Sequence, residues 1–195
     1  MSATPRVVPI QPRRRRPTVS AHGILYPLDV MYAQTGIDGP AAKRTTPDRI
    51  PPPYSTLLVH EKEMTATLEQ YFGGRVAVRA LSTSTKGRSY FRRVLLVMEQ
   101  SGRPVAMGAV RIQLDVFSVR TRARILRRQE PLGRILRDAG INYGSHPTAF
   151  LEITPNSDML GVFWMPERRT LYGRQTQVTL GDDKIGDIVE ILPPV

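Results

Sequence analysis

Two formal charges stand inside segments that otherwise read as buried β-strands. Arg92 lies in the run Ser89-Tyr-Phe-Arg-Arg-Val-Leu-Leu-Val-Met98, and Glu190 lies in Ile185-Gly-Asp-Ile-Val-Glu-Ile-Leu192. Successive strand residues face opposite sides of a sheet, so each charge shares its face with apolar neighbours. A buried charge is costly unless it is paired with an opposite charge or binds a ligand. Both residues therefore need a partner, either each other or an anionic ligand.

The length and composition fit a single folded domain. The chain has 195 residues, of which 41% are hydrophobic, enough for an ordinary core. It has no cysteine, which excludes disulfides and thiolate metal sites. No segment approaches the roughly 18 apolar residues of a membrane span, and the basic N-terminus is not followed by an apolar signal-peptide region. We expect a soluble, unprocessed, cytoplasmic protein that is a monomer or weak oligomer and does not bind a membrane.

Arginine supplies most of a net charge of +11. One cluster is Arg13-Arg14-Arg15-Arg16, between two prolines, and a second occupies a helical stretch with Arg120, Arg122, Arg124, Arg127 and Arg128. Clustered cations of this kind can bind phosphates by releasing counterions. A solvated tail and a solvated helix face explain both clusters more simply, so we expect nucleic acid not to be a partner. Salt-dependent nucleic-acid or acidic-surface binding through the Arg13 to Arg16 arm is the alternative.

The composition and the hydrophobic periodicity of the chain change near residue 50. Residues 1–49 are predicted to be a Pro/Arg-rich, largely irregular N-terminal arm with a short helix around 28–34. Residues 50–195 are predicted to form the folded domain. Three prolines at 51–53 lead into a helical segment, in which Met64, Leu68 and Tyr71 recur at helical spacing before Gly73-Gly74 ends it.

The remaining pattern is dominated by strands that come in hairpins. Strands are predicted at 75–83, 89–98, 104–114, 148–153, 170–180 and 184–192, and further helices at 119–128 and 132–138. This order predicts an α+β fold: a single antiparallel sheet of about six strands with helices on one face.

The sequence lacks the motifs of several common metal-binding, nucleotide-binding and catalytic sites. His22, His60 and His146 are scattered, and His60-Glu-Lys-Glu-Met64 has methionine where a two-histidine zinc helix needs its second histidine. There is no phosphate-binding loop, dinucleotide fingerprint or Gly-x-Ser-x-Gly motif. We therefore expect no metal and no cofactor.

What remains is guanidinium and carboxylate chemistry. The planar fork of arginine holds a carboxylate with two parallel hydrogen bonds and keeps its charge when desolvated. With a glutamate that exchanges a proton, it could bind a small carboxylic acid and act on it. An Arg–Glu pair that only satisfies itself in the core explains the pattern equally well. The alternation of strand residues also does not decide which of Arg92 and Arg93 is the functional arginine, because Arg93 in turn shares its face with the apolar Phe91 and Leu95.

Six short motifs in order from Ile50 to Pro194 resemble the chorismate pyruvate-lyase-like superfamily, in particular its uncharacterised branch. They are Leu57-Leu-Val-His-Glu-Lys-Glu-Met-Thr-Ala-Thr-Leu-Glu69, Tyr90-Phe-Arg-Arg-Val-Leu-Leu96, Gly102-Arg-Pro-Val-Ala-Met-Gly108, Glu130-Pro-Leu-Gly-Arg134, Leu171-Tyr-Gly-Arg174 and Val189-Glu-Ile-Leu-Pro193. The resemblance implies an antiparallel sheet whose ligand pocket is closed by helical flaps, here 57–71 and 131–139.

The resemblance also implies an activity: a cofactor-independent lyase that removes pyruvate from chorismate, or a related carboxylated enol ether, to give 4-hydroxybenzoate. By motif, Arg92 matches the arginine that grips the ring carboxylate, and Glu190 matches the glutamate that manages the proton. Met64 and Leu132 match positions whose backbone lines the ligand. The predicted catalytic residues are thus Arg92 and Glu190, and the predicted substrate-binding residues are these two with Met64 and Leu132.

The sequence departs from the family at one motif, where the family has Trp-Gly-Arg and this chain has Tyr172-Gly173-Arg174. No residue is fixed as a second carboxylate anchor, and Arg174, Arg111 and Arg134 are candidates. Gly108 is expected to serve close strand packing.

The alternative function is a non-catalytic protein that binds a small aromatic acid. The same fold resembles the effector-binding domains of certain bacterial transcription regulators. Those carry a winged-helix domain, which residues 1–50 are too short and Pro-rich to supply.

Overall fold

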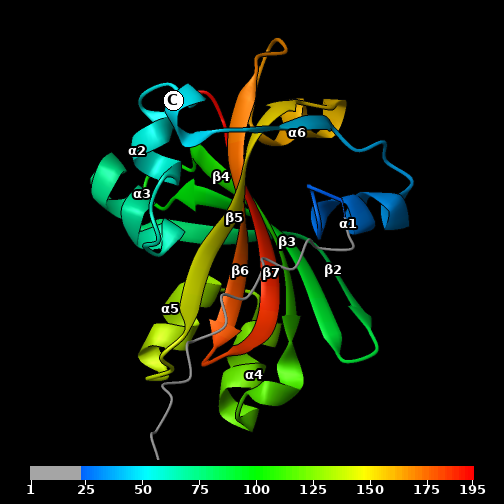
Figure 1. Ribbon diagram of the computed structural model, residues 1–195, viewed down its shortest axis with the longest axis vertical. Coiled ribbons are helices and arrows are strands. Elements are labelled where there is room, and N and C mark those ends of the chain that lie inside the picture. The colour runs from blue at the N-terminus through cyan, green and yellow to red at the C-terminus, as the bar shows by residue number, and fades with distance from the viewer. Residues whose placement is uncertain (1–22) are drawn as a thin grey trace, which may run out of the picture.

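One antiparallel sheet organises residues 23–195, the part of the chain that the computed structural model describes (Figure 1). Its strands are β1 (Ala41–Thr45), β2 (Val76–Lys86), β3 (Ser89–Met98), β4 (Pro104–Gln113), β5 (Gly144–Thr154), β6 (Leu171–Leu180) and β7 (Asp183–Leu192). Their order in space is β1-β5-β6-β7-β4-β3-β2, and every neighbouring pair is antiparallel. The sheet thus has seven strands where the sequence predicted about six, and the additional one, β1, comes from the segment predicted to be irregular.

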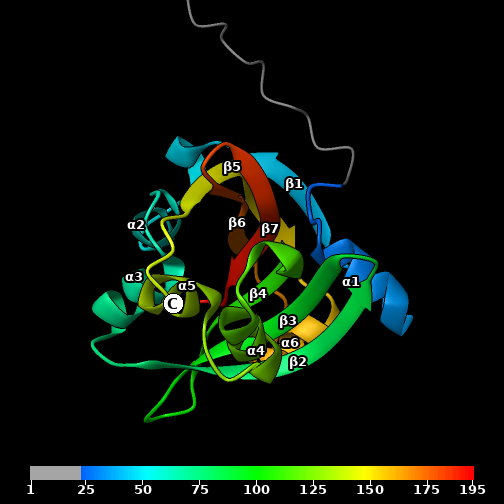
Figure 2. The same cartoon turned by 90° about the horizontal axis from the view of Figure 1, so that it is seen from below.

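Helices cover both faces of this sheet. They are α1 (Leu28–Thr35), α2 (Tyr54–Leu58), α3 (Met64–Phe72), α4 (Val119–Arg127), α5 (Leu132–Asp138) and α6 (Ser157–Val162), with 3₁₀ turns at Pro47–Arg49 and Leu114–Val116. Figure 2 shows α2, α3 and α5 on one side of the strands and α1 on the other. The flap segments 57–71 and 131–139 share one face as predicted, but the first is not one helix: residues 59–63 form a loop between α2 and α3. Helices α1 and α6 pack on the opposite face, which the prediction did not include. None of the helices in residues 23–195 is long and apolar enough to cross a membrane.

Local sequence signals explain where these elements begin and end. The backbone of Gly73 has a φ of 68°, the left-handed conformation that ends α3 at low steric cost. Gly87, in the two-residue turn between β2 and β3, adopts the same left-handed conformation with a φ of 57° and lets the chain reverse direction there. Ser118 begins α4 by accepting a hydrogen bond from the backbone N–H of Thr121, and Asn156 does the same for Met159 at the start of α6.

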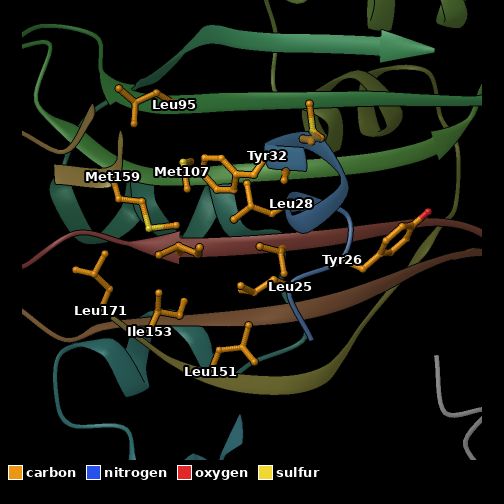
Figure 3. Close-up of a cluster of buried hydrophobic side chains, with 14 of the residues drawn as sticks. Leu25, Tyr26, Leu28, Tyr32, Leu95, Met107, Leu151, Ile153, Met159 and Leu171 are labelled. Carbon is orange, nitrogen blue, oxygen red and sulfur yellow. The ribbon is translucent and has the colours of Figure 1, made fainter. Parts of the chain in front are cut away.

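Residues of the predicted arm contribute to the core. Leu28 and Tyr32 of α1 are 0% and 1% exposed, and they pack with Leu151, Met159 and other side chains on the sheet face opposite the flaps (Figure 3). The short helix predicted at 28–34 is present as α1. The arginine cluster at 13–16 lies outside the described residues, so a nucleic-acid role for it stays a prediction, as does the domain boundary at residue 50.

Leu28→Ala tests whether α1 is part of the cooperative fold. Removing this fully buried side chain should lower the free energy of unfolding by about 2–5 kcal/mol, since both transfer free energy and packing are lost. Chemical denaturation measures the change. Val119→Ala, at a side chain that is 81% exposed, is the control and should change stability by no more than about 0.5 kcal/mol. Equal effects of the two substitutions would show that α1 is not part of the cooperative core.

Candidate ligand-binding site

A cavity of about 70 Å³ lies between the sheet and the flap helices. Its floor comes from β3, β4, β6 and β7, and its roof comes from the first turns of α3 and α5. The four residues predicted from sequence, Met64, Arg92, Leu132 and Glu190, all line it. Most of its other lining side chains are apolar, so charged groups inside it act in a poorly solvated space.

The strand register places Arg92 and Glu190 on one face without joining them. Arg92 of β3 pairs with Val110 of β4, which pairs with Ile188 of β7. Glu190 lies two residues beyond Ile188, on the same face. Two strand spacings across and two residues along put the Cα atoms of Arg92 and Glu190 roughly 12 Å apart. Each charge therefore has a different set of neighbours, and the space between them belongs to the cavity.

Arg92 is buried without an anionic partner. The residue is 2% exposed, and within residues 23–195 its one hydrogen bond runs from Nη1 to the backbone carbonyl of Glu130 at 3.2 Å. Burial lowers the pKa of Arg92, and Tyr90 opposes this shift. An arginine side chain still remains charged at any ordinary pH, and it has five N–H donors. Most of its capacity to bind an anion is thus unused.

Arg93 faces the opposite side of the sheet and has a carboxylate partner there, although its buried Nε makes no hydrogen bond. Its Nη1 and Nη2 donate to the two carboxylate oxygens of Asp158 at 2.7 and 3.2 Å, and its guanidinium lies 4.9 Å from the centre of the Tyr32 ring. The Tyr32 hydroxyl donates to the same carboxylate at 2.8 Å. The structure thus distinguishes the two adjacent arginines: Arg93 connects α1, β3 and α6, and Arg92 faces the cavity.

Glu190 has its own cation, Arg174 on the neighbouring strand β6. The Nε of Arg174 donates to Glu190 Oε2 at 2.6 Å, and Arg174 is 1% exposed. Its Nη1 donates to the carbonyls of Leu58 and His60 at 3.2 and 2.8 Å, and its Nη2 to that of Lys62 at 3.4 Å. One guanidinium therefore holds both the carboxylate on the floor and the loop between α2 and α3.

The three candidates for a second carboxylate anchor are all placed elsewhere or already occupied. The donors of Arg174 are shared between Glu190 and the loop carbonyls. Arg134 pairs with Glu69 at 2.5 Å, between α5 and α3. Arg111 is not among the residues around the cavity, and its Nε donates to Ser89. Among the described arginines of the cavity, Arg92 is the one that lacks a carboxylate partner.

Gly108 keeps the cavity floor open, which differs from the expected role in strand packing. It lies between Val94 on β3 and Glu190 on β7. A Cβ atom added there would meet Val94 Cγ2 at 3.5 Å, an ordinary contact, so close packing does not require glycine. Gly173 is the contrasting case, because its Cβ would lie 2.5 Å from the backbone oxygen of Glu190. That close approach explains the glycine in the Tyr172-Gly173-Arg174 motif.

Sequence reasoning did not single out five polar residues of the cavity, which are Glu63, Thr65, Tyr143, Ser145 and Thr176. Glu63 precedes α3, and burial raises its pKa while Arg137 opposes the shift. Burial, with the nearby negative charge of Glu63, raises the pKa of Tyr143 to about 12. Glu63 stands in a charged run that reads as solvent-exposed, and Thr176 in a strand with no unusual pattern, so local sequence gave no signal for either. In residues 23–195, no three His, Asp or Glu side chains gather as metal ligands.

Comparison with known proteins bears on the fold. No protein-family model matches the sequence, and no curated protein does. The chain is similar to PhnF from Mycobacterium smegmatis, with a TM-score of 0.51 and 11% identity over 69% of this chain and 64% of PhnF, less than two thirds of that protein. It is also similar to gene product SA0254 from Staphylococcus aureus subsp. aureus N315 (TM-score 0.49, 6% identity, 61% of this chain and 83% of that one). A third similar structure is the ligand-binding domain of a protein described as a GntR-family transcriptional regulator from Bordetella bronchiseptica (TM-score 0.45, 13% identity, 60% and 85%).

Together, topology and the likeness to PhnF define the class of fold. The chain is an α+β domain with one open antiparallel sheet, and flap helices close a cavity on one of its faces. The predicted fold class, a single antiparallel sheet with helices that form flaps over a pocket, is confirmed. At these identities the likeness extends to the fold alone.

Exchange of each adjacent arginine for methionine distinguishes a structural charge from one held for a ligand. Arg93→Met should lower the free energy of unfolding by about 2 kcal/mol or more, because it leaves the carboxylate of Asp158 without its cation. Arg92→Met should instead raise it by about 1 kcal/mol, because it removes a desolvated charge that no carboxylate compensates. Chemical denaturation of the ligand-free variants measures both. A loss at Arg92 as large as that at Arg93 would mean that Arg92 has a structural partner.

Proposed function

We propose that this protein is a binding domain for a small organic carboxylate and does not transform it. The observation that carries the proposal is the buried guanidinium of Arg92, which lines the cavity and has no carboxylate partner in residues 23–195. Arginine and carboxylate form two parallel, charge-assisted hydrogen bonds, and a carboxylate ligand would compensate the charge that the protein leaves isolated. The apolar remainder of the cavity suits an aromatic or aliphatic body.

The arrangement around Glu190 favours binding over catalysis. Its Oε2 already accepts a charge-assisted hydrogen bond from Arg174 at 2.6 Å, and the same arginine holds the loop above it. A proton-transfer role would have to compete with this ion pair. Glu190 therefore serves first as the counter-ion that keeps Arg174 in place.

Titration calorimetry with benzoate and 4-hydroxybenzoate tests the proposal. Wild type should bind at least one of these acids, and Arg92→Ala should weaken that binding by about 30-fold or more, the effect of truncating a buried charge partner. Arg120→Ala is the matched control, since it removes the same charge from an exposed position on α4 and should leave affinity within about twofold. Equal affinity in wild type and Arg92→Ala would contradict the proposal.

A lyase acting on chorismate is the second candidate, because Glu190 and Arg92 line the same cavity. Here Arg92 orients the carboxylate, and Glu190 manages the proton as pyruvate leaves. Incubation with chorismate, followed by detection of 4-hydroxybenzoate and pyruvate, tests this candidate. Turnover that falls at least about 100-fold in Glu190→Gln would establish a lyase and overturn the non-catalytic proposal. Binding of the acids without turnover is the result that we expect.

A further inference from the structure

The imidazole of His60 lies between the loop above the cavity and the guanidinium that holds this loop. His60 belongs to residues 59–63, which join α2 to α3 and which we call the roof loop. Its Nε2 donates a hydrogen bond to the carbonyl of Leu57 at 2.8 Å, and its Nδ1 accepts one from the backbone N–H of Lys62 at 3.1 Å. The Nη1 of Arg174 lies 3.2 Å from the same Nδ1. The ring therefore stabilises the loop internally and also contacts the floor of the cavity.

These partners require one protonation state of His60. The carbonyl of Leu57 can only accept a hydrogen bond, so Nε2 carries the ring proton. The backbone N–H of Lys62 and the guanidinium of Arg174 can only donate, so Nδ1 must keep its lone pair. A neutral imidazole with its proton on Nε2 satisfies all three contacts. A doubly protonated ring would direct an N–H at two donors.

Charged and titratable groups face the half-buried His60 from β6, β7 and α3 as well as from its own loop. They are Arg174 on β6, Glu190 on β7, Lys62 in the roof loop and, across a surface hollow of about 330 Å³, Tyr71 on α3. Burial, followed by the positive charge of Arg174, lowers the pKa of His60, whereas Glu190 and the backbone of Leu57 and Lys62 oppose this shift. The neutral ring that the hydrogen bonds require is thus also the form that its surroundings favour.

We infer that His60 positions the roof loop only while it is neutral, and that its protonation releases this loop from Arg174. When Nδ1 gains a proton, the N–H of Lys62 loses its acceptor, and a second cation lies 3.2 Å from the guanidinium. The roof loop leads into Glu63 and Met64, which line the cavity. Release of the loop therefore opens the roof above Glu190, and a fall in pH is the signal that opens it.

The sign of this pH dependence follows from the direction of the shift. Because the pKa of His60 is lowered in the closed loop, the closed form is favoured above the ordinary value of about 6.5 and loses this advantage as the pH falls below it. The uptake of one proton sets a limit on the effect. Between pH 7.5 and 5.5, the equilibrium constant for opening of the loop can rise by at most about tenfold.

Resting on the proposed carboxylate site, release of the roof loop should also weaken binding at Arg92. Water that enters an open cavity weakens the charge-assisted hydrogen bonds of a guanidinium. The charge gained by His60 acts in the opposite direction, since it attracts an anion. Its neighbour Arg174, however, lies three strand spacings from Arg92, roughly 14 Å across the sheet, where a solvated charge changes affinity by less than about twofold.

Hydrogen exchange of the ligand-free protein tests the release directly. The protection factor of the amides in residues 59–63, corrected for the intrinsic effect of pH, should fall about fivefold or more between pH 7.5 and 5.5 in wild type. His60→Asn keeps an acceptor for the N–H of Lys62 but cannot take up the proton, so its protection should change by less than about twofold. His146→Asn changes an exposed histidine on β5 and should respond like wild type.

A second acidic response of the roof loop is separated by the same variant. Glu63 ends the loop, and burial raises its pKa, so acid also acts there. A fall in protection that persists in His60→Asn would assign the response to another group and overturn the inference. Protection that does not fall in wild type would overturn it as well.

Imidazole NMR of wild type covers the case in which His60→Asn does not fold. His60 should carry its proton on Nε2 at neutral pH and should titrate below the ordinary value of about 6.5. A ring that titrates at or above this value, or that carries its proton on Nδ1 when neutral, would overturn the inference.

Benzoate affinity separates the inference from the proposed function. In wild type the affinity for ionised benzoate should fall by about threefold or more across the pH at which His60 titrates, and in His60→Asn by less than about twofold. If wild type does not bind benzoate at pH 7.5, the carboxylate site is overturned, while hydrogen exchange still decides whether His60 controls the loop. Affinity that stays constant although the loop is released would overturn the coupling of His60 to the cavity.

Discussion

The ion pair between Arg174 and Glu190 determines the form of the cavity. Arg174 is 1% exposed. Its guanidinium donates hydrogen bonds to Glu190 on the floor of the cavity and to the backbone carbonyls of Leu58, His60 and Lys62 above it. A buried ion pair compensates for its desolvation only when its remaining hydrogen-bonding groups are satisfied, and here the loop carbonyls satisfy them. The same contacts fix the loop that leads into α3, so the position of the roof and the charge balance of the floor depend on one residue.

Within residues 23–195, this pairing leaves Arg92 on that face without a carboxylate partner. The neighbouring Arg93 shows what a structural arginine looks like in the same strand, with a bidentate carboxylate and an aromatic ring. Of these two consecutive residues, one has a carboxylate partner and the other does not, because strand geometry turns them to opposite faces of the sheet. Proteins keep a destabilising group where function requires it, which is why the contrast points to a ligand at Arg92 and to none at Arg93.

The sequence predicted the regular parts of the fold well and the pairing of charges poorly. Apolar runs bounded by turn residues located β3 and the hairpin strands, and glycine or proline located the end of α3 and the start of α5, because these signals are local. The strand β1 and the helix α6 were missed: β1 is short and polar and is stabilised by pairing with β5, and α6 has only six residues. Whether Glu190 pairs with Arg92 or Arg174 depends on the order of strands in space, which local pattern does not contain. The resemblance selected Arg92 over Arg93, but it could not show that Arg174 is already engaged.

The connections of the roof differ in strength around the cavity, and this has a consequence for access. On the side of the loop at 58–62, buried hydrogen bonds from Arg174 hold the backbone. On the side of α5, two ion pairs join it to α3, Arg134 with Glu69 and Arg137 with Glu63, and the Arg137 side chain is 53% exposed. Partly exposed pairs of this kind contribute about 1 kcal/mol or less each, whereas the bonds of a buried guanidinium contribute more. In polar contacts, the connection of α5 to α3 is therefore weaker than that of the loop to the sheet. A second hollow, which is lined by Arg137 and residues 140–143 and shares Glu63, Tyr143 and Ser145 with the cavity, lies on this α5 side. The weaker polar connection and an approach to the cavity therefore coincide.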